Sequence, residues 1–398
     1  MRISNVTVTP VAIPLEAPLW SSEGVTAPQA LRTILQIATD DGLVGLGEVG
    51  PRITQDRIKA AIPNLLGEDP FGLERLRARF ARGKFYSQEA AGLYAAIEMA
   101  CLDIQGKAIG RPVCDLLGGR LRDDVAVIAY LYRREASDGH PSVRTPDEIV
   151  AHTRDLVARY GFGTIKLKGG TSDPASDIEA VLALRAAFPN AALRLDPNAM
   201  WSVETSLAVA SAIKECKLEW LEDPTPGLDG MAEVTRRGGI PTATNMCLTH
   251  PRELPQALRL RAVDVVLYDL WYWSGLREAK GLADMCQVFG LGLGIHAGGG
   301  SYELGIGLAA MVHMASALPM LVHAMDITYH QLGDDILTEP LRIEGGHIAV
   351  PTGPGLGVDC DPARLERYAE LYRETEAQRA AKRHDPSRPA WLPIYPSW

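Results

Sequence analysis

Two lysines lie two residues apart in the stretch "TIKLKGG", at Lys166 and Lys168, within a run that otherwise has the composition of a buried strand. Alternate side chains of a strand share a face, so both ammonium groups must point into one small space. A strand that frays into solvent is the plain structural interpretation. The chemical one is that each ammonium disfavours charge on the other, which lowers the pKa of one lysine until it can act as a base near neutral pH.

Oxygen-bearing side chains end the three strands that follow. Asp196 ends "AALRLD", Glu222 ends "LEWLE" and Asn245 ends "IPTATN". One such carboxylate before a proline is usually a turn opening. Two carboxylates and an amide carbonyl in register are hard oxygen donors, which predict a Mg²⁺ site. Lysines beside a divalent cation imply that an anionic substrate lies between them.

A histidine and an aspartate end two later strands. His296 closes "LGLGIH" and Asp269 closes the strand before it, in "VDVVLYD". A carboxylate on a neighbouring strand can hold the imidazole tautomer and raise the basicity of the ring. These two residues are therefore predicted to form a second acid–base group opposite the lysines.

The elements that must position these residues are short apolar strands that alternate with helical stretches from Val125 to Val350. Such alternation predicts a parallel sheet, and its even spacing favours closure into a (β/α) barrel. In that fold the carboxyl ends of the strands carry the chemistry. All the polar residues named above then converge on one mouth of the barrel.

The remaining segments predict an α+β unit over residues 1–124 and a C-terminal segment, 351–398, that packs back on it. "LRTILQIATDDGLVGLGEVG" alternates around Asp41-Gly42, which indicates a hairpin with a two-residue turn. Residues 55–117 have helical periodicity, and Gly118 and Gly119 supply a stop.

Composition excludes several classes of function. The 398-residue chain has a net charge of -9 and no Lys/Arg cluster, which argues against a nucleic-acid partner. Its six cysteines include no C-x-x-C pair, and no signal peptide is recognisable at the N-terminus, so we expect a cytoplasmic enzyme. The apolar segment from Gly305 to Met325 is expected to be a buried helix rather than a membrane span. The expected partner is a small carboxylate, and a homo-oligomer is expected.

The motifs resemble, in order and spacing, those of the enolase superfamily, and within it the glucarate dehydratase group of acid-sugar dehydratases. They are "YGFGTIKLKGG", "LDPNAMW", "LEDP", "IPTATNM", "VDVVLYDLW", "GIHAGG", "AMDITYH" and "PGLGV", and they span most of the predicted barrel. Asparagine as the third metal ligand is more specific to that group than the usual glutamate.

The resemblance implies a modified (β/α)7β barrel with an α+β capping domain that the C-terminal segment completes. It implies that Asp196, Glu222 and Asn245 hold Mg²⁺. Lys166 would contact the substrate carboxylate, Lys168 would be the base on one face of the α-carbon, and His296 with Asp269 would serve the other face. The expected substrate-binding residues are Asn198, Tyr130, Arg32 and Asp326.

The reaction that the resemblance implies is removal of the proton α to a carboxylate and loss of the β-hydroxyl, which gives a 2-keto-3-deoxy acid. The sequence departs from the group where the far end of the substrate would bind. Ala297-Gly298-Gly299 stands where the group has Ser-Asn-Asn, Thr328 where it has histidine, and a histidine expected near Thr26 is missing. Which aldarate or aldonate is the substrate therefore stays open.

Three other functions remain as alternatives. Bases on both faces also permit racemisation or epimerisation of a hydroxy acid. A lyase that forms a Schiff base through one lysine is a different class, against which the ring of oxygen ligands argues. A catalytically inactive, metal-binding relative is the non-enzymatic alternative.

Overall fold

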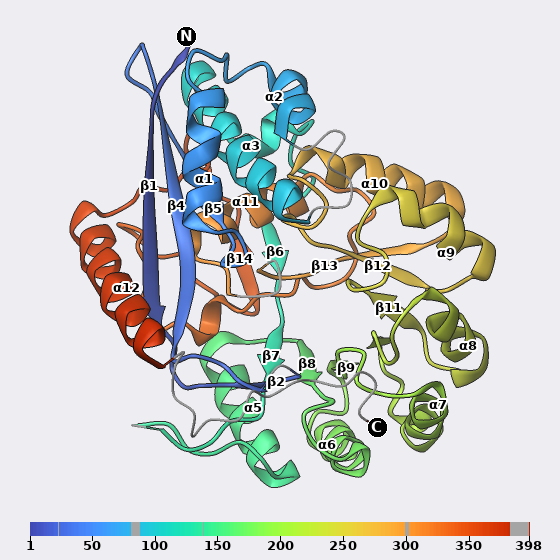
Figure 1. The fold of residues 1–398 in the computed structure, drawn as a ribbon. Coiled ribbons are helices and arrows are strands. Elements are labelled where there is room, and N and C mark those ends of the chain that lie inside the picture. The colour runs from blue at the N-terminus through green and yellow to red at the C-terminus, as the bar shows by residue number, and fades with distance from the viewer. Residues whose placement is uncertain (23, 81–87, 138, 299–301, 383–397) are drawn as a thin grey trace.

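The chain folds into an N-terminal α+β unit packed against a barrel of parallel strands (Figure 1). The structure is a computed structural model, and it describes residues 1–22, 24–80, 88–137, 139–298, 302–382 and 398. The predicted fold class, an α/β barrel with an α+β cap, is confirmed.

The capping unit is built on a three-stranded antiparallel sheet in the order β1-β4-β5. Its strands are β1 (Ile3–Pro14), β4 (Gln29–Thr39) and β5 (Val44–Val49). Helix α3 (Gln88–Ile109) covers β5 at very short range because Gly45 and Gly47 lack side chains. A Cβ at Gly45 would lie 2.0 Å from the carbonyl oxygen of Ala100, so the helix could not approach as closely.

The β4–β5 hairpin is confirmed, but the prediction of a two-residue turn is wrong. Ala38 pairs with Val44, and the Thr39 N–H donates to the Leu43 carbonyl, so the loop contains Asp40, Asp41 and Gly42. Only Gly42 of these three has a positive φ, at 90°. A two-residue turn of the type expected would need positive φ at both positions, which Asp41 does not adopt.

Short helices complete the capping unit. They are α1 (Gln55–Ala61), η1 (Ile62–Asn64), α2 (Leu73–Phe80) and α4 (Val113–Leu116). Thr54 caps α1 by accepting from the Arg57 N–H. After α4, Gly118 and Gly119 both take positive φ, 108° and 98°, which confirms the predicted stop.

The barrel is a parallel sheet in the order β13-β12-β11-β10-β9-β8-β7. Its strands are β7 (Ala129–Leu131), β8 (Thr164–Lys168), β9 (Ala192–Asp196), β10 (Trp220–Glu222), β11 (Thr242–Thr244), β12 (Val265–Tyr268) and β13 (Gly292–Ile295). The segment at residues 325–326 joins the two edges. Met325 N–H donates to the Ala126 carbonyl and Asp326 N–H to the Ile295 carbonyl. The barrel is therefore closed by an eighth, shorter element.

Helices surround the barrel strands. They are α5 (Pro146–Tyr160), α6 (Pro174–Ala187), α7 (Val203–Ala212), η2 (Lys214–Cys216), α8 (Leu228–Gly238), η3 (Pro251–Glu253), α9 (Leu254–Leu260), α10 (Arg277–Phe289), α11 (Gly305–Ser316) and η4 (Tyr329–Gln331). The helix predicted in the apolar segment is confirmed as α11, and all of its residues are buried. No helix in the described ranges is long and apolar enough to cross a membrane.

The C-terminal helix α12 (Pro362–Lys382) contacts β1 of the capping sheet, as Figure 1 shows. Leu365, Tyr368 and Ala369 are buried in this contact. At the other end of the tail, the backbone of Trp398 pairs with Met200 and Ser202, which follow β9.

Two small strand pairs join the units or lie near the barrel mouth. β6 (Asp124–Ala126) pairs with β14 (His347–Ala349), and β2 (Trp20–Ser21) pairs with β3 (Gly24–Val25) in a hairpin of the capping unit. The Trp20 N–H donates to the Arg133 carbonyl just after β7, which ties that hairpin to the barrel.

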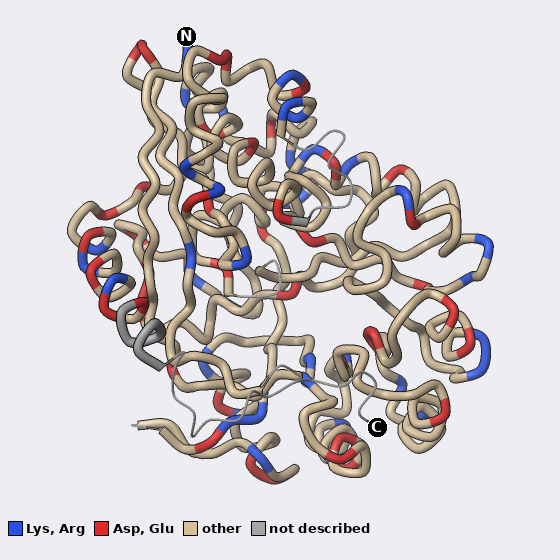
Figure 2. Tube along the Cα trace, in the orientation of Figure 1, with Lys and Arg blue, Asp and Glu red and all other residues tan. Residues whose placement is uncertain are grey.

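Acidic and basic residues are interspersed on the outer helices (Figure 2). Glu233 and Arg236 form an ion pair within α8, and Glu366 and Arg373 form one within α12. Charges of both signs therefore lie close together on these two helices.

Candidate active site

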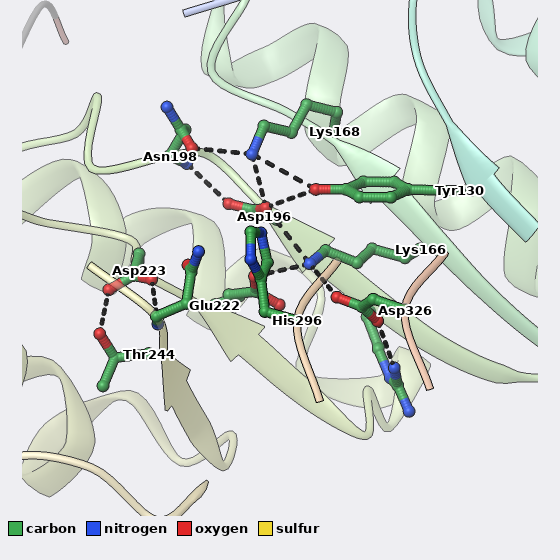
Figure 3. A network of polar contacts seen from close by, with 12 residues as sticks. Tyr130, Lys166, Lys168, Asp196, Asn198, Glu222, Asp223, Thr244, His296 and Asp326 are labelled. Carbon is green, nitrogen blue, oxygen red and sulfur yellow. Dashed lines mark hydrogen bonds and ion pairs between the residues drawn. The ribbon is translucent and has the colours of Figure 1, made fainter. Parts of the chain in front are cut away.

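Both lysines of β8 are buried at the barrel mouth, so the fraying-strand interpretation is wrong. Lys166 is 0% exposed and Lys168 is 7% exposed. The Lys166 ammonium lies 2.6 Å from Glu222 Oε1, 2.7 Å from Asp326 Oδ2 and 3.4 Å from Asp196 Oδ2 (Figure 3). Three carboxylates of three separate barrel segments therefore meet at this one ammonium.

The pKa of Lys166 is set by the carboxylates around it, so Lys166 is not the lysine of the pair whose pKa is predicted to be lowered. Burial acts to lower the pKa of Lys166, but Asp326, Glu222 and Asp196 outweigh it, so that the pKa is raised. Lys166 thus stays a cation. That suits a group that stabilises negative charge and not one that removes a proton.

Lys168 lies in a different set of contacts. Its Nζ donates to Asp196 Oδ2 at 2.7 Å and to Asn198 Oδ1 at 2.7 Å, and lies 3.4 Å from Tyr130 Oη. Tyr130 Oη also donates to Asp196 Oδ2, at 3.0 Å. Lys168, Asn198 and Tyr130 all line the pocket described below. Lys168 therefore faces the space in which a substrate would lie.

The three predicted metal ligands come from adjacent strands. Leu195 pairs with Leu221, so Asp196 and Glu222 are neighbours at the ends of β9 and β10. Asn245 follows β11, and its backbone N–H donates to Asp223 Oδ2 at 2.9 Å. Thr244 Oγ1 also donates to Asp223. Asp223, which has a positive φ of 37°, thereby fixes the loop that presents Asn245.

The donor set fits a hard divalent cation. Burial and the neighbouring Asp196 and Asp326 carboxylates raise the pKa of Glu222 to about 8 even though Lys166 opposes this. For Asp196, burial would raise the pKa, but Lys168 and Lys166 lower it overall. A divalent cation bound to both carboxylates would relieve their repulsion. Within the described ranges, no group of three His, Cys, Asp or Glu side chains is placed so that it could hold a metal ion. The predicted set has only two carboxylates, and its third member is the Asn245 side-chain amide.

His296 and Asp269 form the predicted pair. His296 Nδ1 lies 2.8 Å from Asp269 Oδ2, and Asp269 is fully buried. The other oxygen, Asp269 Oδ1, accepts from the backbone N–H groups of Trp271 at 2.8 Å and Tyr272 at 3.1 Å. The carboxylate is thus fixed by the loop after β12. It orients the imidazole so that Nε2 is left for the pocket that His296 lines.

The pocket has a volume of about 490 Å³ and lies between the capping unit and the barrel mouth. The capping unit supplies one wall and the strand ends supply the other. Its lining comprises Ser21, Ser22, Thr26, Ala27, Gln29, Leu31, Pro51, Arg52, Tyr130, Tyr132, Lys168, Asn198, Asn245, Met246, Thr249, Tyr272, His296, Ala297, Tyr302 and Thr328. A site of this size and polarity suits a small polar molecule.

Two predicted substrate-binding residues, Arg32 and Asp326, lie behind this lining. The buried Arg32 guanidinium pairs with Glu48 at 3.1 Å and donates to the backbone carbonyls of Gly298 and Tyr302. It thus ties the loop after His296 to the capping sheet. Asp326 links Lys166 to Arg194, whose Nη1 lies 2.8 Å from Asp326 Oδ1.

Several departures from the glucarate dehydratase pattern fall in the pocket wall. Thr26, Ala297 and Thr328 all line the pocket, whereas Gly299 lies outside the described residues. Thr328 Oγ1 donates to the buried Glu303 at 2.6 Å. Burial raises the pKa of Glu303 to about 7.

Three residues near the site escaped the sequence reasoning. Ser22 is 2% exposed and accepts a hydrogen bond from Asn198 Nδ2 through its hydroxyl. Arg194 lies within the strand that ends at Asp196, where the alternation of side chains could have indicated that it points into the barrel. Arg52 has no signal in the sequence, because its place at the pocket depends on the packing of two units.

A closed barrel of parallel strands with a capping unit, two buried lysines, a histidine–aspartate pair and an oxygen donor set at the mouth defines an enolase-like enzyme. Residues 148–364 match the family described as "Enolase C-terminal domain-like". Residues 3–118 match "Mandelate racemase / muconate lactonizing enzyme, N-terminal domain". The chain belongs to the enolase superfamily and is similar to its glucarate dehydratase group.

Two relatives bear on the chemistry. A "Probable glucarate dehydratase" of Streptomyces coelicolor is 40% identical over 402 residues, which cover 94% of this chain and 91% of the relative. An "Arabinonate dehydratase" of Saccharolobus solfataricus is 30% identical over 351 residues, which cover 84% of this chain and 89% of the relative.

Solved structures agree over the whole chain. An enolase from Thermobispora bispora, complexed with magnesium and formate, has a TM-score of 0.91 at 42% identity and covers 100% of both chains. An enolase from Mycobacterium smegmatis, complexed with tartrate, has a TM-score of 0.91 at 41% identity and covers 100% of this chain and 98% of the other.

Proposed function

We propose that this enzyme is a Mg²⁺-dependent dehydratase of an acid sugar. The observation that carries the proposal is that Lys168 and His296 line one pocket together with Asn198 and Asn245. Two acid–base groups beside an oxygen donor set are what removal of an α-proton and loss of a β-hydroxyl require. The names of the two dehydratase relatives support the same class of reaction.

Asp196, Glu222 and Asn245 would hold the magnesium ion. The bound ion would supply Lewis-acid stabilisation of charge on the substrate carboxylate. The similar structure complexed with magnesium and formate supports magnesium as the metal. Lys166, fixed by Asp326 at 2.7 Å, would add a second positive charge where the negative charge develops.

Lys168 would take the α-proton, and the electron pair of the C–H bond would form the new carbon–carbon double bond as the β-hydroxyl leaves. His296 would give its proton to that hydroxyl, which departs as water. The resulting enol then becomes a 2-keto-3-deoxy acid. Asp269, 2.8 Å from His296 Nδ1, would orient the imidazole for this transfer.

A screen of aldonates and aldarates with Mg²⁺ tests the proposal. We expect at least one acid sugar to yield a 2-keto-3-deoxy acid, detected by a colorimetric assay for the keto group and by mass loss of one water. Turnover that persists in excess chelator would refute the role of the metal. Failure of every acid sugar in the metal-loaded enzyme would favour the inactive-relative alternative.

Racemisation or epimerisation is the second candidate, because both acid–base groups line the pocket. The two reactions share removal of the α-proton and differ in the fate of the β-hydroxyl. Incubation in D₂O with each acid sugar separates them. Deuterium at the α-carbon of recovered, inverted substrate without a keto product would establish the second reaction.

A further inference from the structure

A buried tryptophan on β10 contacts one of the proposed metal ligands. Trp220 and Glu222 are two residues apart on this strand, so their side chains share one face of it. Both residues are 0% exposed. The Trp220 Nε1–H donates to Glu222 Oε2 at 3.1 Å. The indole therefore reaches along its own strand to a carboxylate at the barrel mouth.

Neighbouring barrel elements hold the indole in one place. The Arg194 guanidinium, from β9, lies over the indole ring, 3.8 Å from its centroid. The His323 ring meets the indole edge-on, with centroids 4.9 Å apart and an interplanar angle of 84°. Apolar side chains of β11 and β12 complete its surroundings, namely Ala243, Val265 and Leu267. Because the ring is enclosed on its face and at its edge, the direction of its N–H is fixed.

The Glu222 carboxylate has two hydrogen-bond partners among the described residues. Lys166 Nζ lies 2.6 Å from Oε1 (Figure 3), and Trp220 donates to Oε2. In the proposed reaction Lys166 also stabilises negative charge on the substrate, so its ammonium would be shared between Glu222 and the substrate. The indole N–H has no such second role. Trp220 would thus be the partner that stays with Glu222 throughout the reaction.

We propose that Trp220 is a positioning residue for the metal, whose N–H orients Glu222 and thereby sets the affinity of the site for Mg²⁺. The inference rests on the proposed function, because it takes Asp196, Glu222 and Asn245 as the metal ligands. A carboxylate oxygen has two lone-pair sites, so a hydrogen bond from the indole leaves Glu222 able to bind an ion. Loss of such a supporting hydrogen bond typically weakens metal binding about 10- to 100-fold.

Replacing Trp220 by phenylalanine tests the hydrogen bond. Phenylalanine keeps an aromatic ring between Arg194 and His323 but has no N–H. In calorimetric titrations of the full chain without substrate, we expect Trp220→Phe to raise the Kd for Mg²⁺ at least about tenfold over the wild type. An unchanged Kd would overturn the proposal.

Trp273→Phe is the matched control. Trp273 is also buried, at 3% exposed, and its Nε1 has no hydrogen-bond partner among the described residues. The same change of ring at this position should leave the Kd for Mg²⁺ unchanged. If both variants weaken Mg²⁺ binding equally, the smaller ring and not the lost hydrogen bond is the cause, and the proposal is overturned.

The indole N–H resonances of the wild type give a second measurement, which decides the case if Trp220→Phe does not fold. Each tryptophan side chain gives one such resonance, and the chain has seven tryptophans. Once the resonances are assigned, that of Trp220 should shift when Mg²⁺ is added, because the ion draws charge from the carboxylate that accepts this N–H. The Trp273 resonance should stay in place. A Trp220 resonance that does not respond to saturating Mg²⁺ would overturn the proposal.

Turnover separates this inference from the proposed function. If Mg²⁺ binding depends on Trp220 but no acid sugar is dehydrated, the positioning role stands and the proposed function fails. If acid sugars are dehydrated with Mg²⁺ and Trp220→Phe keeps the wild-type Kd, the positioning role alone fails. If the wild type binds no Mg²⁺, both fail.

Discussion

Asp326→Asn should destabilise the enzyme by about 3 kcal/mol, because this aspartate balances two buried cations. Its oxygens lie 2.7 Å from Lys166 Nζ and 2.8 Å from Arg194 Nη1, and none of the three residues is more than 2% exposed. Breaking one buried pair typically costs about 3 to 5 kcal/mol. The lower figure applies here because each cation retains another carboxylate partner after the substitution. Lys166 still pairs with Glu222 at 2.6 Å, and Arg194 still pairs with Glu219 at 2.6 Å.

Equilibrium unfolding in urea, without Mg²⁺ and at pH 7, measures the loss. Glu233→Gln is the control, because it removes a carboxylate that pairs with Arg236 at 2.5 Å but is 43% exposed. That control should change the free energy of unfolding by less than about 1 kcal/mol. If Asp326→Asn costs no more than the control, the reasoning about buried charge is refuted.

A double variant checks the cause. Arg194→Met combined with Asp326→Asn removes both charges of one pair, so it should cost at least about 1 kcal/mol less than the sum of the two single changes. Additive losses would mean that the two residues act independently. Arg194 also stacks on the Trp220 ring at 3.8 Å, and methionine retains apolar contact there.

Three further predictions follow from the site and the core. Lys168→Ala and His296→Asn should each lower kcat by at least about 10²-fold, while calorimetry should still detect Mg²⁺ binding. If both variants retain activity, the mechanism with two acid–base groups is refuted. Mg²⁺ at about 100 times its Kd should raise the free energy of unfolding of the wild type by about 2.7 kcal/mol. The same concentration should raise that of Asp196→Asn much less. An equal rise in both proteins would exclude Asp196 as a metal ligand. Burial raises the pKa of Glu98 from its ordinary value of 4.5 to about 7, so the protonated form is favoured in the folded state and stability is lost as pH rises through that window. Between pH 4.5 and 8, the wild type should lose about 3 kcal/mol relative to Glu98→Gln, and a flat difference in urea unfolding would contradict the assignment.

The sequence predicts the barrel well because its signal is local. Each strand is a short apolar run that ends in a polar residue, and parallel strands bring those ends to one mouth. Lys166, Lys168, Asp196, Glu222 and His296 were all found this way. The strand pattern thus indicated these positions, and the resemblance to the enolase superfamily implied their individual roles.

Other features depend on contacts that no local pattern encodes. The loop between β4 and β5 is one residue longer than the Asp-Gly dipeptide suggested, because the register of Ala38 and Val44 sets its length. The sequence predicts a lowered pKa for one lysine of the pair, and Lys166 is not that lysine, because carboxylates raise its pKa. The sequence places Lys168 beside it, whereas the folded chain adds carboxylates such as Asp326, 160 residues away. The charge balance at a buried site depends on residues that the fold brings together, so the sequence of one strand cannot predict it.

The contacts of Lys168 explain how the capping unit can affect chemistry on a barrel strand. A divalent cation held by Asp196 would compete with Lys168 for the carboxylate, whose Oδ2 accepts from Lys168 at 2.7 Å and from Tyr130 at 3.0 Å. Asn198 would then be the partner that keeps Lys168 in place. Because Asn198 is itself held by the Ser22 hydroxyl on the capping hairpin, the position of that hairpin determines where the proposed base lies. The Asn198 side-chain amide would therefore link the capping hairpin to the proposed base on the barrel strand.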